Sequence, residues 1–186
     1  MLFVGEIMVA TLYYTTHRAT IGTLLLVASE RGLRYVTLLE AGEEASAHLV
    51  QKFATPPTPV LMELDGFFAT TIAAIERYLN DGARLKVPYD LAEGTHLQRA
   101  VWLEIARIPY GETITYSTLA ERVGFPRAVR AVASACGANP VPLAIPCHRV
   151  VAKDGSLGGF SLGGLSVKEK LLKLEAPAYA RVTEAA

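Results

Sequence analysis

Two glycines that interrupt a long run of strand-forming residues constrain the fold of the first part of the chain. The stretch "VATLYYTTHRATIGTLLLVASERGLRYVTLL" is rich in Thr, Tyr, Val and Leu, as β-strands are. It breaks at Ile21-Gly22 and again at Arg31-Gly32. Glycine at such breaks is typical of tight turns between strands. The pattern therefore predicts a short antiparallel meander.

Two helices are predicted after the meander. The segment "AGEEASAHLVQKF" is a short helical stretch, and the three prolines of "TPPTPVL" end it. The next segment, "LMELDGFFATTIAAIERYLNDG", has Gly82 just past its end, where a C-cap belongs. Its apolar residues recur at helical spacing, at Phe68, Ile72, Ile75 and Leu79. This half shows no group of residues that suggests chemistry, so we expect a supporting domain.

The composition is that of a folded globular chain. Of the 186 residues, 51% are hydrophobic and 19% are charged, which excludes a disordered chain. No apolar run approaches the roughly 18 residues that span a bilayer, and the opening "MLFVGEIMVATLYY" lacks the basic region of a secretory signal. We therefore expect a cytoplasmic protein without a membrane partner. Whether Met1 or Met8 is the natural start stays open.

Cysteine and histidine are too few and too scattered for a disulfide framework or a metal site. The cysteines are Cys136 and Cys147, and the four histidines show no metal-ligand spacing. A reducing compartment suits such a chain. We expect no metal and no cofactor, and a structural role for Cys136.

The net charge of zero hides a difference between the two halves. Residues 1–93 carry seven Lys and Arg against eleven Asp and Glu, whereas residues 94–186 carry eleven against seven. A polyanionic partner would therefore prefer the second half. The excess is modest and is equally typical of an ordinary solvated surface.

The tract "ARLKVPYDLAEGT" is interpreted as the connection between two domains. Thr95 can cap the next helix, "HLQRAVWLEIARI", whose buried face is marked by Leu97, Val101, Ile105 and Ile108. We expect an N-terminal domain over residues 1–93, a C-terminal domain over 94–178 and a tail over 179–186.

The C-terminal half contains a helix-turn-helix pattern. The text "TYSTLAERVGFPRAVRAVASACGAN" predicts a helix, a turn at Gly124-Phe125-Pro126 and a second helix. An ordinary pair of helices without DNA contact gives the same pattern, so both interpretations stay open at this point. Arg127 and Arg130 are expected to project from the second helix among small residues, which are Ala128, Ala131, Ala133, Ser134, Ala135, Gly137 and Ala138.

The stretch "IPCHRV" places Cys147 beside His148. Most free cysteines are buried and inert, and "PLAIPCHRVVA" is as apolar as a buried strand. A reactive thiol instead needs a base that makes the thiolate. Adjacent side chains on a strand point to opposite faces, so a turn or a bridging water would have to connect this cysteine and this histidine.

The C-terminal half resembles a known family. The segment "RAVRAVASACGANPVPLAIPCHRVVAKDGSLGGFSLGGLSVKEKLLKLE" is similar to the active-site half of the O6-alkylguanine-DNA alkyltransferases, and the similarity runs from about "GTHLQRAVW" to Glu175. It implies an α+β protein. An N-terminal β-meander plus helix domain, ribonuclease H-like in the family, would be followed by a mostly helical C-terminal domain with a winged-helix/helix-turn-helix DNA-binding motif.

The resemblance implies catalytic roles. Cys147 would be the nucleophile and alkyl acceptor, and His148 would deprotonate it through a water. Glu175 would orient that histidine, and Asn139 would hold the turn before the cysteine. Tyr116 would donate its phenolic proton to the guanine as the alkyl group leaves. Without the resemblance, a solvated carboxylate, an Asn-Pro turn and a packed aromatic are the plainer interpretations of the last three.

The resemblance also implies how DNA and the damaged base are held. Arg130 would enter the base stack, and the remaining DNA-binding residues would be Arg127, Ser117, Thr118, Ala131 and Ser134. The loop "GSLGGFSLGG" would close over the base through Val150, Gly158, Gly159, Phe160 and Ser161. This loop departs from the family pattern, because many members have Tyr at the position of Phe160 and "FSLGGL" is one residue longer than in some relatives.

The implied partner is double-stranded DNA containing O6-alkylguanine, with O4-alkylthymine as a second candidate lesion, bound by a monomer close to the nucleoid. Because O6 lies inside the duplex, the nucleotide must leave the stack. The thioether formed is stable, so each molecule would react once. The rivals are a non-catalytic sensor of alkylated DNA, a cysteine hydrolase and a helix-turn-helix regulator. The first would lack the acceptor cysteine, the second would need an oxyanion hole, and the third would leave "IPCHRV" unexplained.

Overall fold

The predicted meander is confirmed. The computed structural model describes residues 11–59 and 62–176, so Met1, Met8 and the predicted tail lie outside the described residues. Strands β1 (Tyr13–Ala19), β2 (Gly22–Ser29) and β3 (Gly32–Leu39) pair in sequence as antiparallel neighbours. The glycine breaks stand where the turns end, and each glycine begins a strand.

The sheet has one further strand that the sequence did not indicate. The two residues of β4 (Thr58–Pro59) pair in parallel with β1, which gives the order β3-β2-β1-β4. They come from the proline-rich segment, where proline is tolerated because an edge strand can leave N–H groups unpaired. The proline-rich stretch therefore ends one helix, as predicted, and also forms an edge strand of the sheet.

Helices cover both faces of the sheet. Helix α1 (Ala45–Lys52) packs through Leu49 against Leu25 and Val27 of β2, whereas helix α2 (Met62–Asp81) joins the main core, which contains Leu24 and Leu26. Strand β2 is consequently buried on both faces, because alternate residues point to opposite sides. The predicted C-cap of α2 is confirmed at Gly82, which has a φ of 68°.

The second half is mostly helical. Helix α3 (His96–Ile105) begins with the predicted cap, since the Thr95 and Gln98 side chains and backbone groups bond reciprocally. It ends earlier than predicted, although Ile108 is buried. The remaining elements are β5 (Ile114–Thr115), α4 (Tyr116–Arg122), α5 (Val129–Gly137), the 3-10 turn η1 (Cys147–Arg149), β6 (Val150–Val151) and α6 (Gly164–Glu175). Strands β5 and β6 pair in parallel.

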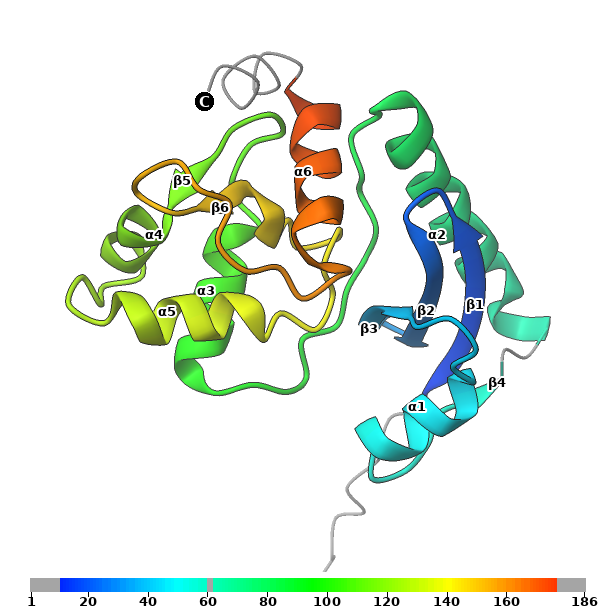
Figure 1. Cartoon of the computed structure of the whole chain (residues 1–186). Helices are drawn as coiled ribbons and strands as arrows, with labels where there is room; N and C mark the ends of the chain where they lie inside the picture. The colour runs from blue at the N-terminus through cyan, green and yellow to red at the C-terminus, as the bar shows by residue number, and fades with distance from the viewer. Residues whose placement is uncertain (1–10, 60–61, 177–186) are drawn as a thin grey trace, which may run out of the picture.

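The connecting tract is docked along the sheet. The Leu33 amide of β3 donates to the Pro88 carbonyl at 3.0 Å, and the Asp90 amide donates to the Leu33 carbonyl at 2.8 Å. Further along β3, the Val36 amide donates to the Pro140 carbonyl at 2.8 Å. The two halves stand side by side, with α6 on the side of the C-terminal half that faces α2 (Figure 1). Buried residues from both halves form one core.

The docking of the tract can be tested at Gly32. A Cβ atom there would lie 2.6 Å from the Pro88 carbonyl carbon, whereas nothing lies within 4 Å at Gly42, which also has a positive φ. We expect Gly42→Ala to cost about 1 kcal/mol of backbone strain, and Gly32→Ala to cost about 1 to 3 kcal/mol more through overpacking. Urea unfolding of both variants measures the difference, and equal costs would show that the tract is not packed on β3.

Candidate active site

Cys147 lies on a single 3-10 turn and not on a strand. The turn η1 spans Cys147–Arg149, and only Val150–Val151 pair as strand β6. The interpretation of "PLAIPCHRVVA" as a buried strand is therefore wrong for most of its length, whereas the turn considered as the alternative at Cys147 and His148 is present. The physical reason is that Pro142 and Pro146 have no N–H to donate to a ladder, so the apolar run folds as consecutive turns.

The Asn139 side chain holds the backbone that leads to Cys147. Its Nδ2 donates to the Ile145 carbonyl at 2.8 Å and to the Cys147 Sγ at 3.2 Å, while its Oδ1 accepts from the Val141 amide at 3.1 Å. Between these contacts Leu143 has a φ of 75°, which costs a residue with a side chain of order 1–3 kcal/mol. The hydrogen bonds of Asn139 offset this strain and place an N–H donor on the sulfur.

The imidazole of His148 is fixed by Glu175. The ring Nε2 lies 3.0 Å from Glu175 Oε1, and the two side chains are 0% and 1% exposed. An ionised carboxylate can only accept, so Nε2 carries the proton and Nδ1 keeps its lone pair. Within the described residues Nδ1 is buried without a hydrogen-bond partner. The ring therefore has a free acceptor, as a general base requires.

Arg149 and a tyrosine of the N-terminal half hold the same carboxylate. The Arg149 guanidinium donates to both oxygens, at 2.7 and 2.8 Å, and also to the Ile108 carbonyl at 2.6 Å. The hydroxyl of Tyr78, on α2, donates to Glu175 Oε1 at 2.7 Å and lies 3.3 Å from His148 Nε2. Glu175 is consequently an anchored group and not a solvated helix end.

These contacts set the charge of the resting site. Burial raises the pKa of the Cys147 thiol to about 11, despite the hydrogen bond from Asn139. Burial also lowers the pKa of His148, although Glu175 opposes the shift. Burial would raise the pKa of Glu175, but hydrogen bonds from His148, Arg149 and Tyr78 hold it well below its usual range. At neutral pH the site holds a thiol, a neutral imidazole and a carboxylate.

A buried lysine shapes the loop that follows β6. Lys168 of α6 is 0% exposed, and its ammonium donates to the carbonyls of Val150, at 2.6 Å, and of Leu157. It also lies 3.4 Å from the Gly159 carbonyl. Burial lowers the pKa of this ammonium. Lys168 thus ties the strand after the cysteine to the glycine-rich loop.

Tyr116 packs against Gly158 of the glycine-rich loop that follows β6. A Cβ atom at Gly158 would lie 3.0 Å from the Tyr116 ring, so only glycine fits there, where φ is 64°. Burial, and then the nearby Cys136 and Cys147, raise the pKa of Tyr116 to about 12. The half-buried Phe160 ring meets the His148 ring edge-on at 6.3 Å. Tyr116 is therefore a protonated phenol, near enough to Cys147 for negative charge on that sulfur to raise its pKa.

The remaining predicted residues lie apart from the thiol. Ser161 is exposed and lines a hollow toward β3, beside Leu38 and Gly163. Arg130, Ala131 and Ser134 are exposed on α5. Arg127 is also exposed, but it lies in the turn before α5 and does not project from the helix as predicted, because the helix begins at Val129. In the first turn of α4, Ser117 is half-buried, and the Thr118 hydroxyl pairs with that of Thr115.

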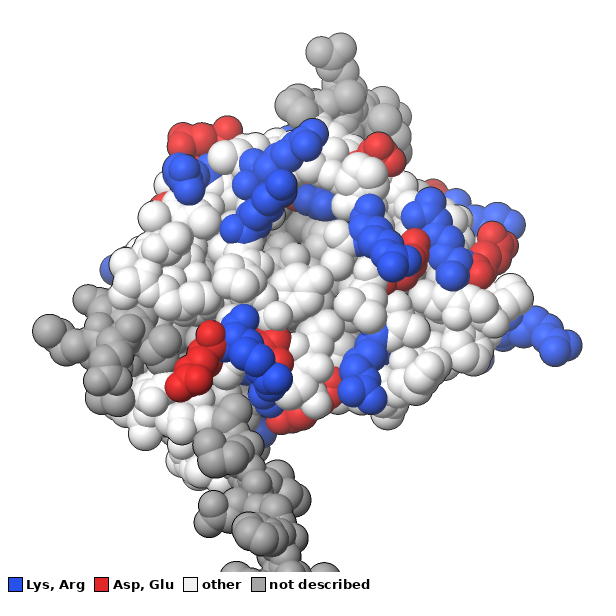
Figure 2. Space-filling model, turned by 180° about the vertical axis from the view of Figure 1, so that it is seen from behind, with Lys and Arg blue, Asp and Glu red and all other residues white. Residues whose placement is uncertain are grey.

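The face of the molecule opposite to the one seen in Figure 1 carries both positive and negative side chains. Figure 2 shows that face, where Lys and Arg side chains of the described residues stand in separate groups and several lie next to Asp or Glu. A continuous basic strip is therefore not what marks this side of the protein. The exposed cations of the predicted DNA-binding segment are Arg127, before α5, and Arg130, on α5.

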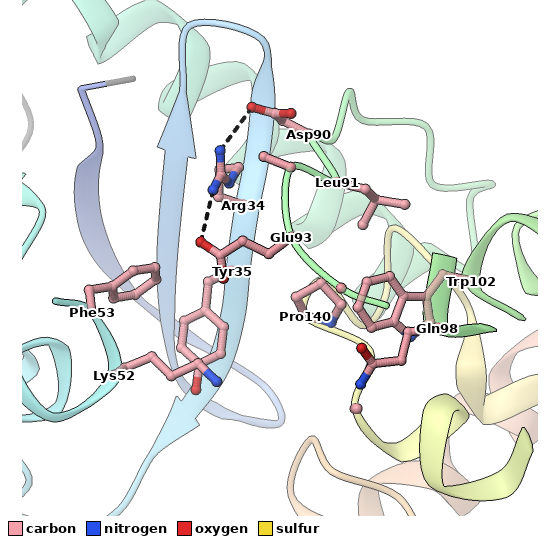
Figure 3. Close-up of a pocket in the computed structure, with 13 residues that line it drawn as sticks. Arg34, Tyr35, Lys52, Phe53, Asp90, Leu91, Glu93, Gln98, Trp102 and Pro140 are labelled. Atoms are coloured by element: carbon pink, nitrogen blue, oxygen red, sulfur yellow. Dashed lines mark hydrogen bonds and ion pairs between the residues drawn. The ribbon is translucent and has the colours of Figure 1, made fainter. Parts of the chain in front are cut away.

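A cavity lies between the two halves, away from the thiol. It has a volume of about 240 Å³ and is lined by Arg34, Tyr35 and Lys52 on one side and by Trp102 and Pro140 on the other (Figure 3). Arg34 is already paired with Asp90 and Glu93, at 3.3 and 3.2 Å. The charge of Arg34 is therefore paired within the chain, and we assign no chemistry to this cavity.

Three residues of the site carried no signal that we recognised in the sequence. Lys168 has the appearance of an exposed lysine in a charged helix, and Arg149 that of a surface cation. Tyr78 falls next to the predicted apolar stripe of α2, where a buried hydroxyl demands a partner. That demand was a usable signal, but it did not indicate a partner 97 residues away.

Within residues 11–59 and 62–176, no group of three or more His, Cys, Asp or Glu side chains could hold a metal ion. Among the same residues, no helix is long and apolar enough to cross a bilayer.

Comparison with known proteins defines the class. Residues 96–177 match the family model described as "6-O-methylguanine DNA methyltransferase, DNA binding domain". A methylated-DNA–protein-cysteine methyltransferase of Methanosarcina acetivorans is 38% identical over 165 residues, which cover 88% of this chain and 98% of that protein. The chain therefore belongs to the methylated-DNA–protein-cysteine methyltransferase family.

Solved structures agree with this assignment. The chain is similar to the O6-methylguanine methyltransferase of Mycobacterium tuberculosis, with a TM-score of 0.73 and 33% identity over 93% of this chain and 99% of that one. It is also similar to the same organism's OGT in complex with DNA, with a TM-score of 0.72 and 34% identity over 92% and 99% of the two chains. The mixed α+β fold, with an N-terminal sheet and a helical second half, is confirmed.

Acid should destabilise the fold through Glu175. The pKa of Glu175 is lower in the folded chain than in the unfolded chain, where a glutamate titrates at about 4.3. As the pH falls past that value the unfolded chain binds the proton first, so the free energy of unfolding decreases. Urea titrations between about pH 5 and about pH 3 should show this loss.

The matched variant is Glu175→Gln. It should be less stable than the parent at neutral pH, because buried donors lose their charged acceptor. It should also lose less stability on acidification, since position 175 no longer titrates. An equal acid-induced loss in both proteins would contradict the role assigned to this carboxylate.

Proposed function

We propose that the protein repairs DNA by direct reversal, transferring an alkyl group from O6-alkylguanine in duplex DNA to its own Cys147. The observation that carries this function is the pairing of the Cys147 sulfur with the Asn139 amide beside a histidine whose Nδ1 is free. Family membership supplies the substrate class, because the relatives are named for methylated DNA and a cysteine acceptor.

The chemistry follows from the charge of the resting site. A thiol with a pKa of about 11 is a thiolate in roughly one molecule in ten thousand at pH 7. His148 therefore has to take the thiol proton, through a bridging water, at its free Nδ1. The imidazolium formed would be stabilised by Glu175, which is already ionised and aligned with Nε2–H.

The transfer step forms one bond and breaks one bond. The thiolate attacks the alkyl carbon in line, the new S–C bond forms, and the C–O6 bond breaks with its electron pair on guanine. Tyr116, a protonated phenol beside the thiol, would donate the proton that leaves guanine neutral. The thioether is stable, so each molecule reacts once and the protein is consumed stoichiometrically.

DNA would be engaged through α4 and α5. We infer that α5 enters the minor groove, with Arg130, Arg127, Ala131 and Ser134 against DNA and Ser117 and Thr118 near the backbone. Extruding a nucleotide costs a few kcal/mol, and the Arg130 side chain would occupy the vacated stack. The extruded base would lie under the loop 158–161, with Val150, Gly158, Gly159, Phe160 and Ser161 around it.

The same proposal covers finer features of the fold and setting. We infer that the N-terminal domain, residues 1–93, is ribonuclease H-like, because a meander with a helix on each face and a short parallel strand suits that class. The C-terminal domain, residues 94–178, would be of the winged-helix type. We also propose that a monomer acts at the nucleoid, since one chain supplies every residue of the site.

The rival functions fit the site less well. A non-catalytic sensor of alkylated DNA has no use for an acceptor cysteine that receives an amide hydrogen bond. A cysteine hydrolase needs its base in reach of the sulfur and an oxyanion hole, whereas in the described residues the hydrogen bond to the Cys147 sulfur comes from Asn139 and not from His148. Alkyl transfer uses every group of the network.

The central test is a mass measurement. The protein is incubated with a short duplex containing O6-methylguanine, and intact and peptide masses are taken. We expect a gain of one methylene unit on the peptide that carries Cys147, saturating at one per protein. Cys147→Ala should gain nothing, and Cys136→Ala should react like the parent. Binding without a mass gain would indicate a sensor, and repeated turnover would indicate a hydrolase.

The role of Arg130 can be separated from that of the thiol. Arg130→Ala should slow transfer from duplex DNA about tenfold or more, because nothing replaces the extruded nucleotide. Transfer from a single-stranded oligonucleotide should change little, since there is no stack to open. Arg99→Ala, at an exposed arginine of α3, is the matched control. Equal slowing on both substrates would argue against insertion into the stack.

A further inference from the structure

We propose that Tyr78 is a positioning residue through which the N-terminal half holds the His148–Glu175 pair in the arrangement that activates Cys147. This role rests on the proposed function and adds a group to it. Tyr78 lies on α2, outside the residues 96–177 that match the family model, and it is 97 residues from Glu175.

The hydroxyl of Tyr78 has one proton and uses it on the carboxylate. It donates to Glu175 Oε1 at 2.7 Å, so toward His148 Nε2, at 3.3 Å, it presents an oxygen lone pair. The Nε2–H of His148 therefore faces two acceptors, Oε1 and the tyrosine oxygen. Both favour the tautomer protonated at Nε2, which leaves Nδ1 free to receive the thiol proton.

Tyr78 is a permanent donor. Burial, followed by the negative charge of Glu175, raises the pKa of this phenol well above its ordinary value, so it stays protonated wherever the protein is folded. The other charged groups that act on the His148 ring are Glu175 and Lys168 of α6 and Arg149 of η1. None of them supplies the neutral oxygen that Tyr78 places beside Nε2.

Packing alone does not explain a tyrosine here. The side chain is 1% exposed within the main core, where a phenylalanine would fill nearly the same volume and bury no polar group. A buried hydroxyl is costly unless it is hydrogen-bonded. The hydroxyl is therefore the part of this residue that needs a functional explanation.

Other contacts from the N-terminal half support the backbone of the site. The Val36 amide binds the carbonyl of Pro140, next to Asn139. Leu38 packs so closely on Gly163 that a Cβ atom there would lie 2.7 Å from its Cδ1. Tyr78 differs from both because its hydroxyl touches the carboxylate and lies beside the imidazole themselves.

Single-turnover kinetics with Tyr78→Phe test the role. At saturating duplex DNA containing O6-methylguanine we expect the rate constant for methyl transfer to fall about tenfold, in line with the loss of a hydrogen bond to a charged group. The dissociation constant for DNA and the final amplitude of one methyl per protein should not change. Tyr110→Phe is the matched control, because its hydroxyl donates to the Gly82 carbonyl at 2.6 Å and not to the carboxylate. It should keep the parent rate.

The pH dependence separates positioning from stability. Tyr78→Phe removes a donor at 2.7 Å from Glu175 and a more distant oxygen, at 3.3 Å, from His148 Nε2. The shorter contact dominates, so Glu175 becomes a stronger acceptor for the imidazole proton. His148 then protonates more readily, and the acid limb of the rate profile moves to higher pH. A purely structural loss would lower the amplitude or the melting temperature and leave that limb in place. In the Glu175→Gln background, Tyr78→Phe should have no further effect on the rate.

The outcomes are distinct. Parent-like rate and pH profile in Tyr78→Phe, with active parent protein, would overturn the role of Tyr78 and leave the proposed function intact. Additive effects of the two substitutions would also overturn it, because they would show that Tyr78 does not act through Glu175. No methyl transfer by the parent protein would instead overturn the proposed function itself.

Discussion

The rest of the site depends on the hydrogen bonds that the Glu175 carboxylate accepts. The carboxylate accepts five hydrogen bonds, from the Tyr78 hydroxyl, His148 Nε2, two nitrogens of Arg149 and the Gly111 amide. These donors come from α2, η1 and the turn before β5, so one carboxylate at the end of α6 connects both halves of the chain. A buried charge is tolerated only when it is paired and hydrogen-bonded. The same bonds that make this charge tolerable also orient the base, so stability and reactivity are coupled at this point.

The thiol is held in the opposite electrostatic state. Burial keeps Cys147 protonated, and the Asn139 amide that shapes the preceding turn also donates to the sulfur. Because the His148 base is neutral as well, no thiolate–imidazolium ion pair forms between Cys147 and His148 before substrate arrives. A suicide protein benefits from this arrangement, since a permanently ionised thiol would be spent on any small electrophile. The N-terminal half, expected from the sequence to be a supporting domain, takes part through Tyr78 and through β3, which holds the Pro140 carbonyl.

The local elements were predictable wherever a single residue type decides the backbone. Gly22 and Gly32 set the meander, Thr95 and Gln98 form the capping box, and the turn at Gly124 separates α4 from α5. The interpretation of the apolar run around Cys147 as a strand was wrong, because it rested on apolar composition and did not weigh Pro142 and Pro146, which cannot donate to a ladder. The partners of Tyr78, Arg149 and Lys168 were out of reach for a different reason. Each depends on contacts between separate elements of the fold, 97 residues apart for Tyr78 and Glu175 and 18 for Lys168 and Val150, and the side chains themselves look the same whether exposed or buried.

The state of the His148 ring tests this arrangement most directly, because every other element of the site either sets it or uses it. We would record the ¹⁵N chemical shifts of both ring nitrogens at pH 7 in the free protein, assigned with a His148→Gln variant. A neutral ring with the proton on Nε2 and a bare Nδ1 is the predicted result. A proton on Nδ1, or a fully protonated ring paired with a thiolate, would contradict it and would mean that Cys147 is activated before DNA binds.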